Sequence, residues 1–293
     1  FVGNLLGTSV LTQVTTVPAN FSVTGGVVTL PPYTFAFGND GYVAFSVPNT
    51  PANFTGSGSG NASITGQKIV KGMPLRGGPG NSPSGLFWSA DSLIRASYVG
   101  GTPIFQFDTI STQSSILSSS SVIEYDGIFY WIGTDRFLMF NGVVREIENN
   151  INLNFFFDNL NYEQRQKVFA VKVPRFGEIW WCFPFGDSTE PNHAICYNVR
   201  ENTWYDTELP NGGRGAGIFP AVFRQPLMSG VAPQDAEAVT VAVAAGGTGY
   251  TVGDTLTVVG GLGQIDTELT VSTVSGAGAV TGVTISNAGQ YTT

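Results

Sequence analysis

The residues of this chain that could do chemistry are few. His193 is the only histidine, and Cys182 and Cys196 are the only cysteines. His193 is predicted to lie in a loop with no nucleophile motif nearby, so a histidine-based triad is not indicated. The three side chains could approach one another across one hairpin, but a zinc site takes about four ligands and no fourth is evident. We therefore expect buried free thiols, with a cross-strand disulfide as the alternative, and no metal site.

Carboxylates are the other candidates, because a polysaccharide hydrolase works with a pair of them. Asp126 and Asp135 lie at predicted turns, where aspartate is favoured for backbone reasons. Asp158 and Glu178 flank predicted elements, and nothing in the sequence fixes the carboxyl separation that such an enzyme needs. The glycine-rich residues 75–80 lack the Gly-Lys-Ser/Thr ending of a phosphate loop. We predict no catalytic residues, no enzymatic activity and no cofactor.

Charge is scarce in this chain and unevenly placed. Charged residues make up 12% of the 293 residues, and the net charge is -8. All 13 lysines and arginines precede residue 231, which argues against binding of a phosphate backbone or an anionic membrane by the remainder. No apolar run reaches membrane-spanning length. A surface this poor in charge suits a subunit packed among neighbours.

The elements that must position these residues are predicted to be antiparallel strands. The turns Asp126-Gly127 and Asn141-Gly142 separate runs rich in β-branched and aromatic residues between residues 122 and 147. Both dipeptides favour tight hairpins because their residues tolerate positive φ. Four such runs make a meander, the unit of a propeller blade. An Asn39-Asp40-Gly41 hairpin is predicted near the N-terminus.

A second meander is predicted over residues 167–205, and a partial one over residues 85–107. Trp88, Trp131 and Trp180 are spaced 43 and 49 residues apart, near the period of about 40–50 residues of propeller blades. We therefore expect an all-β fold with a propeller-like domain in which Trp131 and Trp180 occupy equivalent blades. A β-sandwich made from the same strands is the alternative.

One helix is predicted between the two meanders, because Asn161 and Gln164 match a capping box and residues 163–167 are good helix formers. The aromatic residues Phe155 and Phe156 precede it. Trp180 and Trp181 are adjacent on a predicted strand and must face opposite sides. These four aromatic side chains are candidates for interface contacts, and core packing is the alternative that we favour.

Composition divides the chain into three parts. Residues 1–65 are a Gly/Thr/Val/Ser-rich β segment that could be an insertion, ending near a predicted flexible loop at residues 56–61. Residues 66–230 contain all five tryptophans and form the propeller-like domain. Residues 231–293 lack Phe and Trp, and their Thr/Val alternation predicts a small, separate, outward-facing β-repeat module. Because Gly249-Tyr250-Thr251 recurs loosely 41 residues later, we expect this module to be incomplete.

Several motifs of the middle part resemble a group of tailed-phage virion proteins. They are residues 71–78 (Lys-Gly-Met-Pro-Leu-Arg-Gly-Gly), 86–95 (Leu-Phe-Trp-Ser-Ala-Asp-Ser-Leu-Ile-Arg), 124–127 (Glu-Tyr-Asp-Gly), 135–142 (Asp-Arg-Phe-Leu-Met-Phe-Asn-Gly), 162–169 (Tyr-Glu-Gln-Arg-Gln-Lys-Val-Phe) and 202–205 (Asn-Thr-Trp-Tyr). The resemblance covers about residues 66–230 and implies a propeller-like protein of the tail, in the manner of podovirus nozzle or neck proteins. The Gly-Tyr-Thr-Val-Gly-Asp stretch at 249–254 resembles repeats appended to phage structural proteins. Neither resemblance implies catalytic residues.

Two function classes follow from these expectations. The first is a structural subunit of the virion tail, assembled in the host bacterial cytoplasm. Its partners would be copies of itself in a ring and other tail or neck proteins, and DNA would pass without specific binding. The second is an adhesin that binds a receptor or host surface glycan through the C-terminal repeats. Ring assembly by the purified protein favours the first class, and saturable glycan binding by an isolated subunit favours the second.

Overall fold

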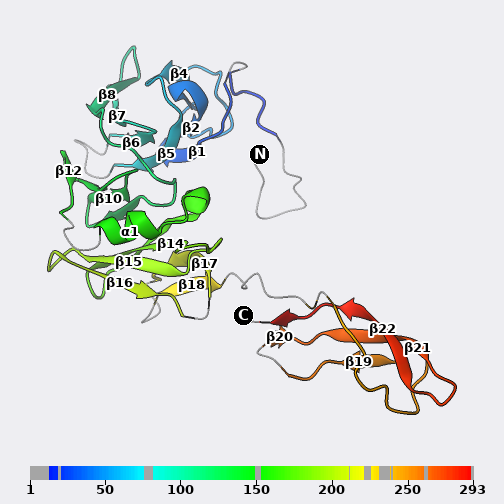
Figure 1. Ribbon diagram of the computed structural model, residues 1–293. Helices are drawn as coiled ribbons and strands as arrows, with labels where there is room; N and C mark the ends of the chain where they lie inside the picture. Colours follow the sequence, from blue (N-terminus) through cyan, green and yellow to red (C-terminus); the bar gives the residue numbers. More distant parts are fainter. Residues whose placement is uncertain are drawn as a thin grey trace. The chain divides into compact units, whose positions relative to one another are not determined.

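The computed structural model describes residues 13–18, 21–75, 82–148, 153–210, 212–220, 226–230, 238, 240–260 and 263–291. The glycine-rich residues 76–80 therefore lie outside the described part. The chain forms two compact units, Phe1–Ser229 and Gly230–Thr293. The second begins next to the boundary predicted at residue 231. The fold is all-β, as the sequence predicts, and its sheets are antiparallel (Figure 1).

The first unit contains four four-stranded sheets, and each is a meander of consecutive strands. The first sheet comprises β1 (Gly26–Leu30), β2 (Tyr33–Phe37), β3 (Tyr42–Phe45) and β4 (Gly60–Ser63), with the short 3-10 helix η1 (Asn39–Gly41) between β2 and β3. The second comprises β5 (Ile69–Pro74), β6 (Ser84–Ser89), β7 (Leu93–Tyr98) and β8 (Phe105–Ser111). The third comprises β9 (Ile123–Tyr125), β10 (Ile128–Ile132), β11 (Phe137–Phe140) and β12 (Val144–Glu146). The fourth comprises β13 (Phe169–Val173), β14 (Glu178–Phe183), β15 (His193–Asn198) and β16 (Thr203–Glu208).

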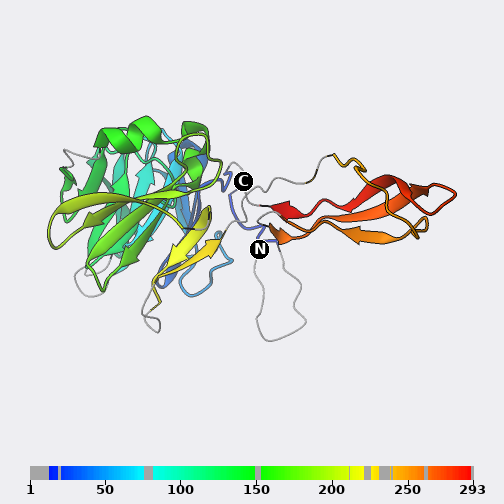
Figure 2. The ribbon, with the colours of Figure 1, turned by 60° about the horizontal axis from the view of Figure 1, so that its bottom comes forward.

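Consecutive sheets pack face to face, which produces a row of stacked sheets (Figures 1 and 2). One cluster joins the first sheet to the second around Phe35 and Phe87. A second joins the second sheet to the third around Trp88 and Trp131. A third, around Trp181, joins the third sheet to the fourth. These strands therefore form four stacked meanders and not the two facing sheets of a sandwich.

Two of the predicted hairpin turns form with positive φ at both residues. At the third, Asn141-Gly142, β11 and β12 pair as predicted, but only Gly142 has a positive φ, and Phe140 pairs with Val144 across a three-residue loop. Asp126 and Gly127 have φ of 50° and 81°, and they join β9 to β10, whose residues pair in antiparallel register. Asp40 and Gly41 have φ of 56° and 64° between the paired strands β2 and β3. Trp131 on β10 and Trp180 on β14 both lie on the second strand of their meander.

The N-terminal segment differs from the expectation. The predicted flexible loop at residues 56–61 overlaps β4, where Gly60 pairs with Phe45. A Cβ on Gly60 would lie 2.6 Å from the Phe45 ring, so the glycine is needed for close packing here and not for flexibility. The sheet β1–β4 shares its core with β5–β8. The segment therefore belongs to the same unit as the middle part, because its Phe and Val side chains form one half of that shared core.

The helical connection also differs. The α-helix of the described residues, α1 (Leu153–Asn159), carries the Phe155–Phe157 run that we placed ahead of the helix. Tyr162–Lys167 is instead the 3-10 helix η3, and the Asn161 side chain makes no capping hydrogen bond. Its side-chain Nδ2 instead donates to the Ser188 carbonyl oxygen at 3.1 Å, and the predicted capping box does not form. Both helices lie at one end of the strands, between the third and fourth sheets (Figure 2).

A pair of shorter strands follows the fourth sheet. β17 (Arg214–Ile218) and β18 (Leu227–Gly230) form a two-stranded sheet, and β17 contacts β13. A Cβ on Gly217 would lie 2.4 Å from a Val171 methyl group, which shows how closely β17 approaches the fourth sheet. Met228 packs on the same side. The pair therefore covers part of the free face of the fourth sheet.

The second unit is small and has a thin core. It contains β19 (Thr255–Thr257), β20 (Gly263–Ile265), β21 (Glu268–Val274), β22 (Val280–Asn287) and β23 (Gln290–Tyr291), in sheets ordered β19-β21-β22 and β20-β23. Its fully buried hydrophobic residues in the described part are Leu269, Val271 and Val280. The recurring Tyr residues are not equivalent, because Tyr250 lies outside the strands and Tyr291 lies in β23.

The predicted Thr/Val strand at residues 239–243 is not an assigned strand among the residues described. Residues on either side of it nevertheless bond to β22 or to the residue that follows it. The Ala238 amide donates to the Ala288 carbonyl at 3.0 Å, and the Val280 amide donates to the Gly246 carbonyl at 2.8 Å. Between these two bonds, a cavity of about 300 Å³ separates residues 241–247 from the sheet. The small apolar side chains of this segment therefore run beside β22 without completing the pairing.

A chain that ends at Ser229 should keep the fold of the first unit, because the four inter-sheet clusters of this unit contain no residue beyond Ser229. We expect one cooperative melting transition at a temperature within a few degrees of that of the full chain, measured by circular dichroism. Loss of cooperative melting in the truncated chain would show that the two units share one core.

Candidate functional site

The sequence candidates Glu178, Trp180, Cys182 and Cys196 meet on one face of the fourth sheet, together with Tyr205. We call these five residues the fourth-sheet face. Alternate residues of β14 point to the same side of the sheet. The register then places Trp180 opposite Cys196, and Cys196 opposite Tyr205 on β16. Three neighbouring strands therefore bring a carboxylate, two thiols and two polar aromatic groups together.

Hydrogen bonds tie this face into one network. Glu178 Oε2 accepts from the Trp180 indole N–H at 2.9 Å and from the Tyr205 hydroxyl at 3.0 Å. Burial raises the pKa of Tyr205, and the neighbouring Cys196 and Glu178 add to this shift. A phenol held in its protonated form beside a carboxylate acceptor is a hydrogen-bond donor and not a base. The network consequently orients side chains and offers no group poised for proton transfer.

The two cysteines are free, buried thiols, as the sequence analysis favoured. Cys182 lies opposite Ala194 and Cys196 lies opposite Trp180, so the thiols are diagonal neighbours and not a directly paired cross-strand couple. Burial raises the pKa of Cys182 to about 12 and that of Cys196 well above its ordinary value. Since the thiolate is the nucleophile, neither side chain is reactive at neutral pH.

We predicted that His193 lies in a loop, but it is the first residue of strand β15. It pairs with Phe183, and its ring stacks on Phe185 with ring centroids 4.2 Å apart. This stacking extends the edge of the fourth sheet. Within the ranges that the structure describes, no group of three or more His, Cys, Asp or Glu side chains is placed to hold a metal ion.

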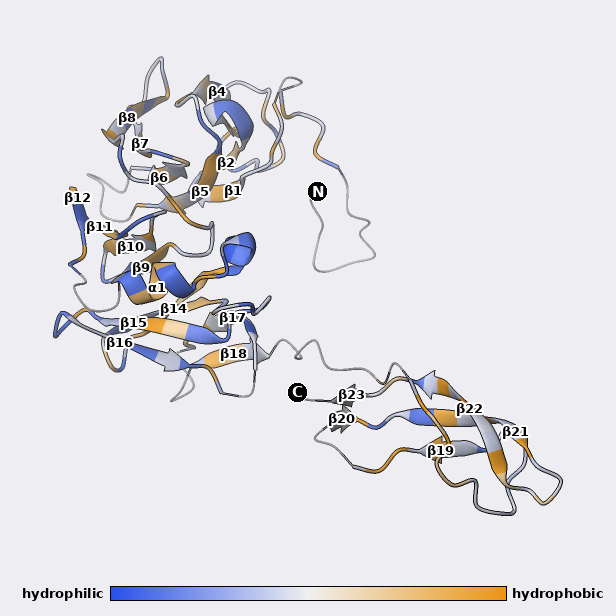
Figure 3. Ribbon diagram, viewed as in Figure 1, coloured by the Kyte–Doolittle hydropathy of each residue, from blue (hydrophilic) through white to orange (hydrophobic). Residues whose placement is uncertain are grey.

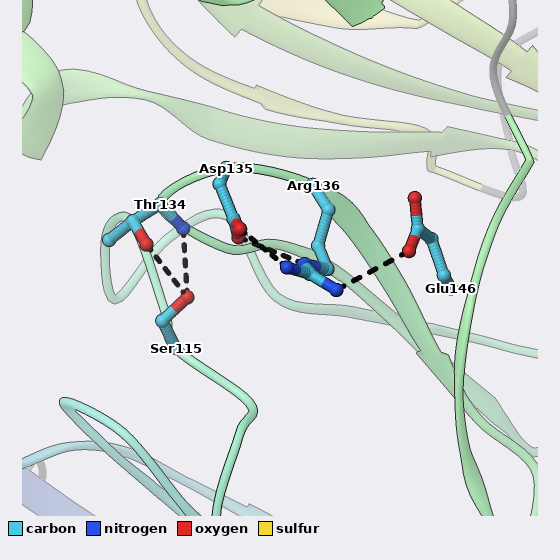
Figure 4. Close-up of polar contacts among 5 residues, drawn as sticks. All are labelled: Ser115, Thr134, Asp135, Arg136 and Glu146. Carbon is cyan, nitrogen blue, oxygen red and sulfur yellow. Dashed lines mark hydrogen bonds and ion pairs between the residues drawn. The ribbon is translucent and has the colours of Figure 1, made fainter.

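Asp135 is held in an exposed ion pair (Figure 4). Arg136 donates to Asp135 at 2.6 and 3.0 Å and also approaches Glu146 at 3.5 Å. The hydrogen bond from Arg136 lowers the pKa of the Asp135 carboxyl group. At the same turn, Ser115 Oγ accepts from the Thr134 amide at 2.9 Å. An ionised carboxylate paired in this way cannot supply the proton of a glycosidase general acid.

Asp126 and Asp135 are too far apart to act as a glycosidase pair. Asp126 and Asp135 lie at opposite ends of β10, so a strand of five residues separates them by about 17 Å. Glycosidases need about 5–10 Å between the two carboxyl groups. Asp158 lies in α1, and the accepting oxygen of Glu178 is engaged by Trp180 and Tyr205.

The four candidate interface aromatics divide into two pairs. Trp181 and Phe156 are fully buried in the cluster between the third and fourth sheets. Trp180 and Phe155 keep part of their surface exposed. The adjacent tryptophans thus face opposite sides of β14, as predicted. The tryptophan that matches Trp131 is Trp181, because both face the preceding sheet.

Indole hydrogen bonds support that match. The Trp131 indole N–H donates to the Ser115 carbonyl at 3.0 Å. The Trp181 indole N–H donates to the Ser121 carbonyl at 2.8 Å. Both acceptors lie in the segment that joins the second sheet to the third. The sequence spacing pointed to Trp180 because two tryptophans are adjacent and spacing alone cannot tell which of them faces inward.

Sequence reasoning missed a repeated turn between the second and third strands of the first three meanders. The patterns are Gly38-Asn39-Asp40-Gly41-Tyr42-Val43, Ser89-Ala90-Asp91-Ser92-Leu93-Ile94 and Gly133-Thr134-Asp135-Arg136-Phe137-Leu138. In the second and third sheets, the first residue of the pattern donates its amide to the carbonyl of the fourth residue at 2.8 Å. In the first sheet, the Gly38 amide reaches the Tyr42 carbonyl at 3.2 Å. An aspartate is the third residue of each pattern, and a search for six-residue repeats could have found it.

Comparisons with known proteins add little to this geometry. No protein-family model matches the chain, and no curated protein matches it. A crystal structure of an exported protein from Bacteroides fragilis is similar at 11% sequence identity and a TM-score of 0.35. The likeness covers 68% of this chain, which spans 63% of that structure's length. No helix among the described residues is long and apolar enough to span a membrane.

The adjacent tryptophans should differ sharply in their effect on stability. Replacing the fully buried Trp181 by Ala should lower the free energy of unfolding by about 3–5 kcal/mol, since it empties the centre of a core cluster. The matched variant Trp180→Ala should cost less than half as much, because part of this ring is already exposed. Urea denaturation followed by circular dichroism measures both values. Equal losses would contradict the assignment of faces.

The thiols should resist modification in the folded protein. With pKa values raised by burial, both stay protonated at pH 8. Ellman's reagent should therefore find no fast-reacting thiol in the native chain and two thiols in 6 M guanidinium chloride. A rapid native reaction at either cysteine would contradict the packing of the fourth-sheet face.

Proposed function

We propose that this chain is a non-enzymatic structural subunit of a tailed-phage particle, in the nozzle, tube or neck of the tail. In this proposal the stacked meanders form part of a closed, propeller-like body. Copies assemble into a ring that contributes to the conduit through which DNA is delivered. The resemblance of residues 66–230 to phage tail proteins supports the assignment to the tail.

The observation that carries the proposal is that the side chains that could do chemistry have structural roles. Asp126 forms a turn, Asp135 pairs with Arg136, the cysteines fill a core, and His193 stacks on Phe185. Each has a structural role in a row of sheets. Such a row, with few charges, is suited to bearing contacts between subunits.

The adhesin alternative has no comparable support. It places a glycan site in the C-terminal repeats, whose cavity beside β22 is lined by small and apolar residues, Tyr250 excepted. Sugar sites need convergent hydrogen-bonding groups in addition to apolar ones. We therefore favour the structural subunit.

The purified full chain should self-associate into a closed ring of defined copy number as its concentration rises. Analytical ultracentrifugation gives the mass of the assembly, and negative-stain microscopy shows whether it is a ring. A chain that stays monomeric up to about 100 µM, well above the range of ordinary subunit affinities, would contradict the proposal. Saturable binding of a host envelope glycan by the monomer would favour the adhesin instead.

A further inference from the structure

The free face of the fourth sheet is only partly covered. In the first three sheets, the second-strand residues Phe35, Trp88 and Tyr130 face the next sheet and are at most 5% exposed. Their counterpart on the fourth sheet, Trp180, keeps exposed surface, and Tyr205 is 38% exposed. Trp180 and Tyr205 stay exposed because the sheet that packs on this face, β17–β18, has two strands. In the first three sheets, the sheet that packs on the corresponding face has four strands.

The covering pair ends in an open edge. β17 contacts the innermost strand β13, and in the part of the chain that the structure describes β18 has no strand beyond it. The exposed apolar side chains Ile218 and Leu227, at 62% and 48%, belong to this pair. Two further strands on the β18 side would complete a four-stranded cover and bury Trp180.

The edge strand β18 lacks the charged side chains that the last strand of most other sheets in the first unit carries. Exposed edge strands usually carry charges that oppose pairing with another chain. β8 carries Asp108, β12 carries Arg145 and Glu146, and β16 carries Asp206 and Glu208. β4 is uncharged, but it has only small and polar side chains. β18 is uncharged and carries Leu227 and Met228, and it is orange over much of its length in Figure 3.

The second unit carries a matching edge. β19 pairs only with β21 in the described part, and its other side is open. The run Thr255-Leu256-Thr257-Val258-Val259 has no charge, and Val259 is 94% exposed. This unit buries few large side chains and leaves several valines at its surface. A β module with so thin a core gains stability when a neighbour covers that surface.

We propose that β18 of one copy pairs with β19 of the C-terminal unit of a second copy, and that the exposed Val259 then covers Trp180 and Tyr205. Main-chain hydrogen bonds join the two edges, and the alternate side chains fill the open half of the fourth-sheet face. The donor and acceptor surfaces differ, so the contact is head-to-tail and repeats from copy to copy until a ring closes. The inference deepens the proposed ring assembly and rests on it.

Two single substitutions test the two edges of the proposed contact separately. Leu227→Lys places a charge at the β18 edge, and Val259→Lys places one beside β19. Both side chains are exposed, so each variant should melt like the parent chain. Val143→Lys is the matched control, since Val143 is 58% exposed at the turn between β11 and β12, away from both edges.

Each blocked variant alone should associate at least tenfold more weakly than the parent in analytical ultracentrifugation, and the control should match the parent. A one-to-one mixture of the two blocked variants should form dimers and nothing larger. The intact β19 edge of the Leu227→Lys variant can pair with the intact β18 edge of the Val259→Lys variant, and both remaining edges are blocked. Hydroxyl-radical footprinting should show that Trp180 is protected in the parent assembly and exposed in dilute monomer.

The outcomes separate this contact from the proposed function. Assemblies of both blocked variants that equal those of the parent would overturn the contact and leave ring assembly standing. Blocked variants that are monomeric alone and fail to form a dimer when mixed would also overturn it. Protection of Trp180 in dilute monomer would show that the same chain covers the face. A parent chain that never associates would overturn both the contact and the ring.

Discussion

Burial of both faces of each four-stranded sheet is the constraint on which the rest of the first unit depends. A meander of four short strands is not stable alone, because one or both of its faces are apolar. Here the contact of Trp88 with Trp131, at 5.7 Å between ring centroids and 75° between planes, lies at the middle of the row. Comparable aromatic contacts join the outer pairs of sheets, such as Phe35 with Phe87 and Phe137 with Trp181.

This constraint accounts for the fate of the chemically capable residues. A stacked sheet has inward faces that take apolar side chains and turns that take aspartate and glycine. Cys182 and Cys196 lie on a face, and Asp126 and Asp135 lie at turns. Glu178 is the exception, because it is a carboxylate within a strand near an apolar cluster. Its bonds to Trp180 and Tyr205 satisfy it where the covering sheet is narrow.

The sequence predicted features that depend on neighbouring residues. Asp126-Gly127 forms its hairpin because both residues accept positive φ, and no distant contact is needed. The side chains that pack against a given face of a sheet come from distant parts of the sequence and could not be predicted in the same way. The sequence around Gly60 predicts a flexible loop, but the residue lies in a strand, where its lack of a side chain leaves room for the Phe45 ring.

The helical connection and the tryptophan pair show the same limit. Asn161 matches a capping residue in sequence, but the chain at Ser188 competes for its side chain. Trp180 and Trp181 are both compatible with the blade spacing, and only packing against the third sheet decides between them. The candidate site depended on long-range placement throughout. Its residue types were therefore identified, and their grouping with Tyr205 was not.

Native-state hydrogen exchange with mass spectrometry tests most directly whether the stacked sheets depend on one another. If inter-sheet burial holds the unit together, the amides of β6, β10 and β14 should exchange slowly and with one common free energy of opening. Added denaturant should then release all three strands in a single step. Separate openings of the individual sheets, each with its own free energy, would contradict the account.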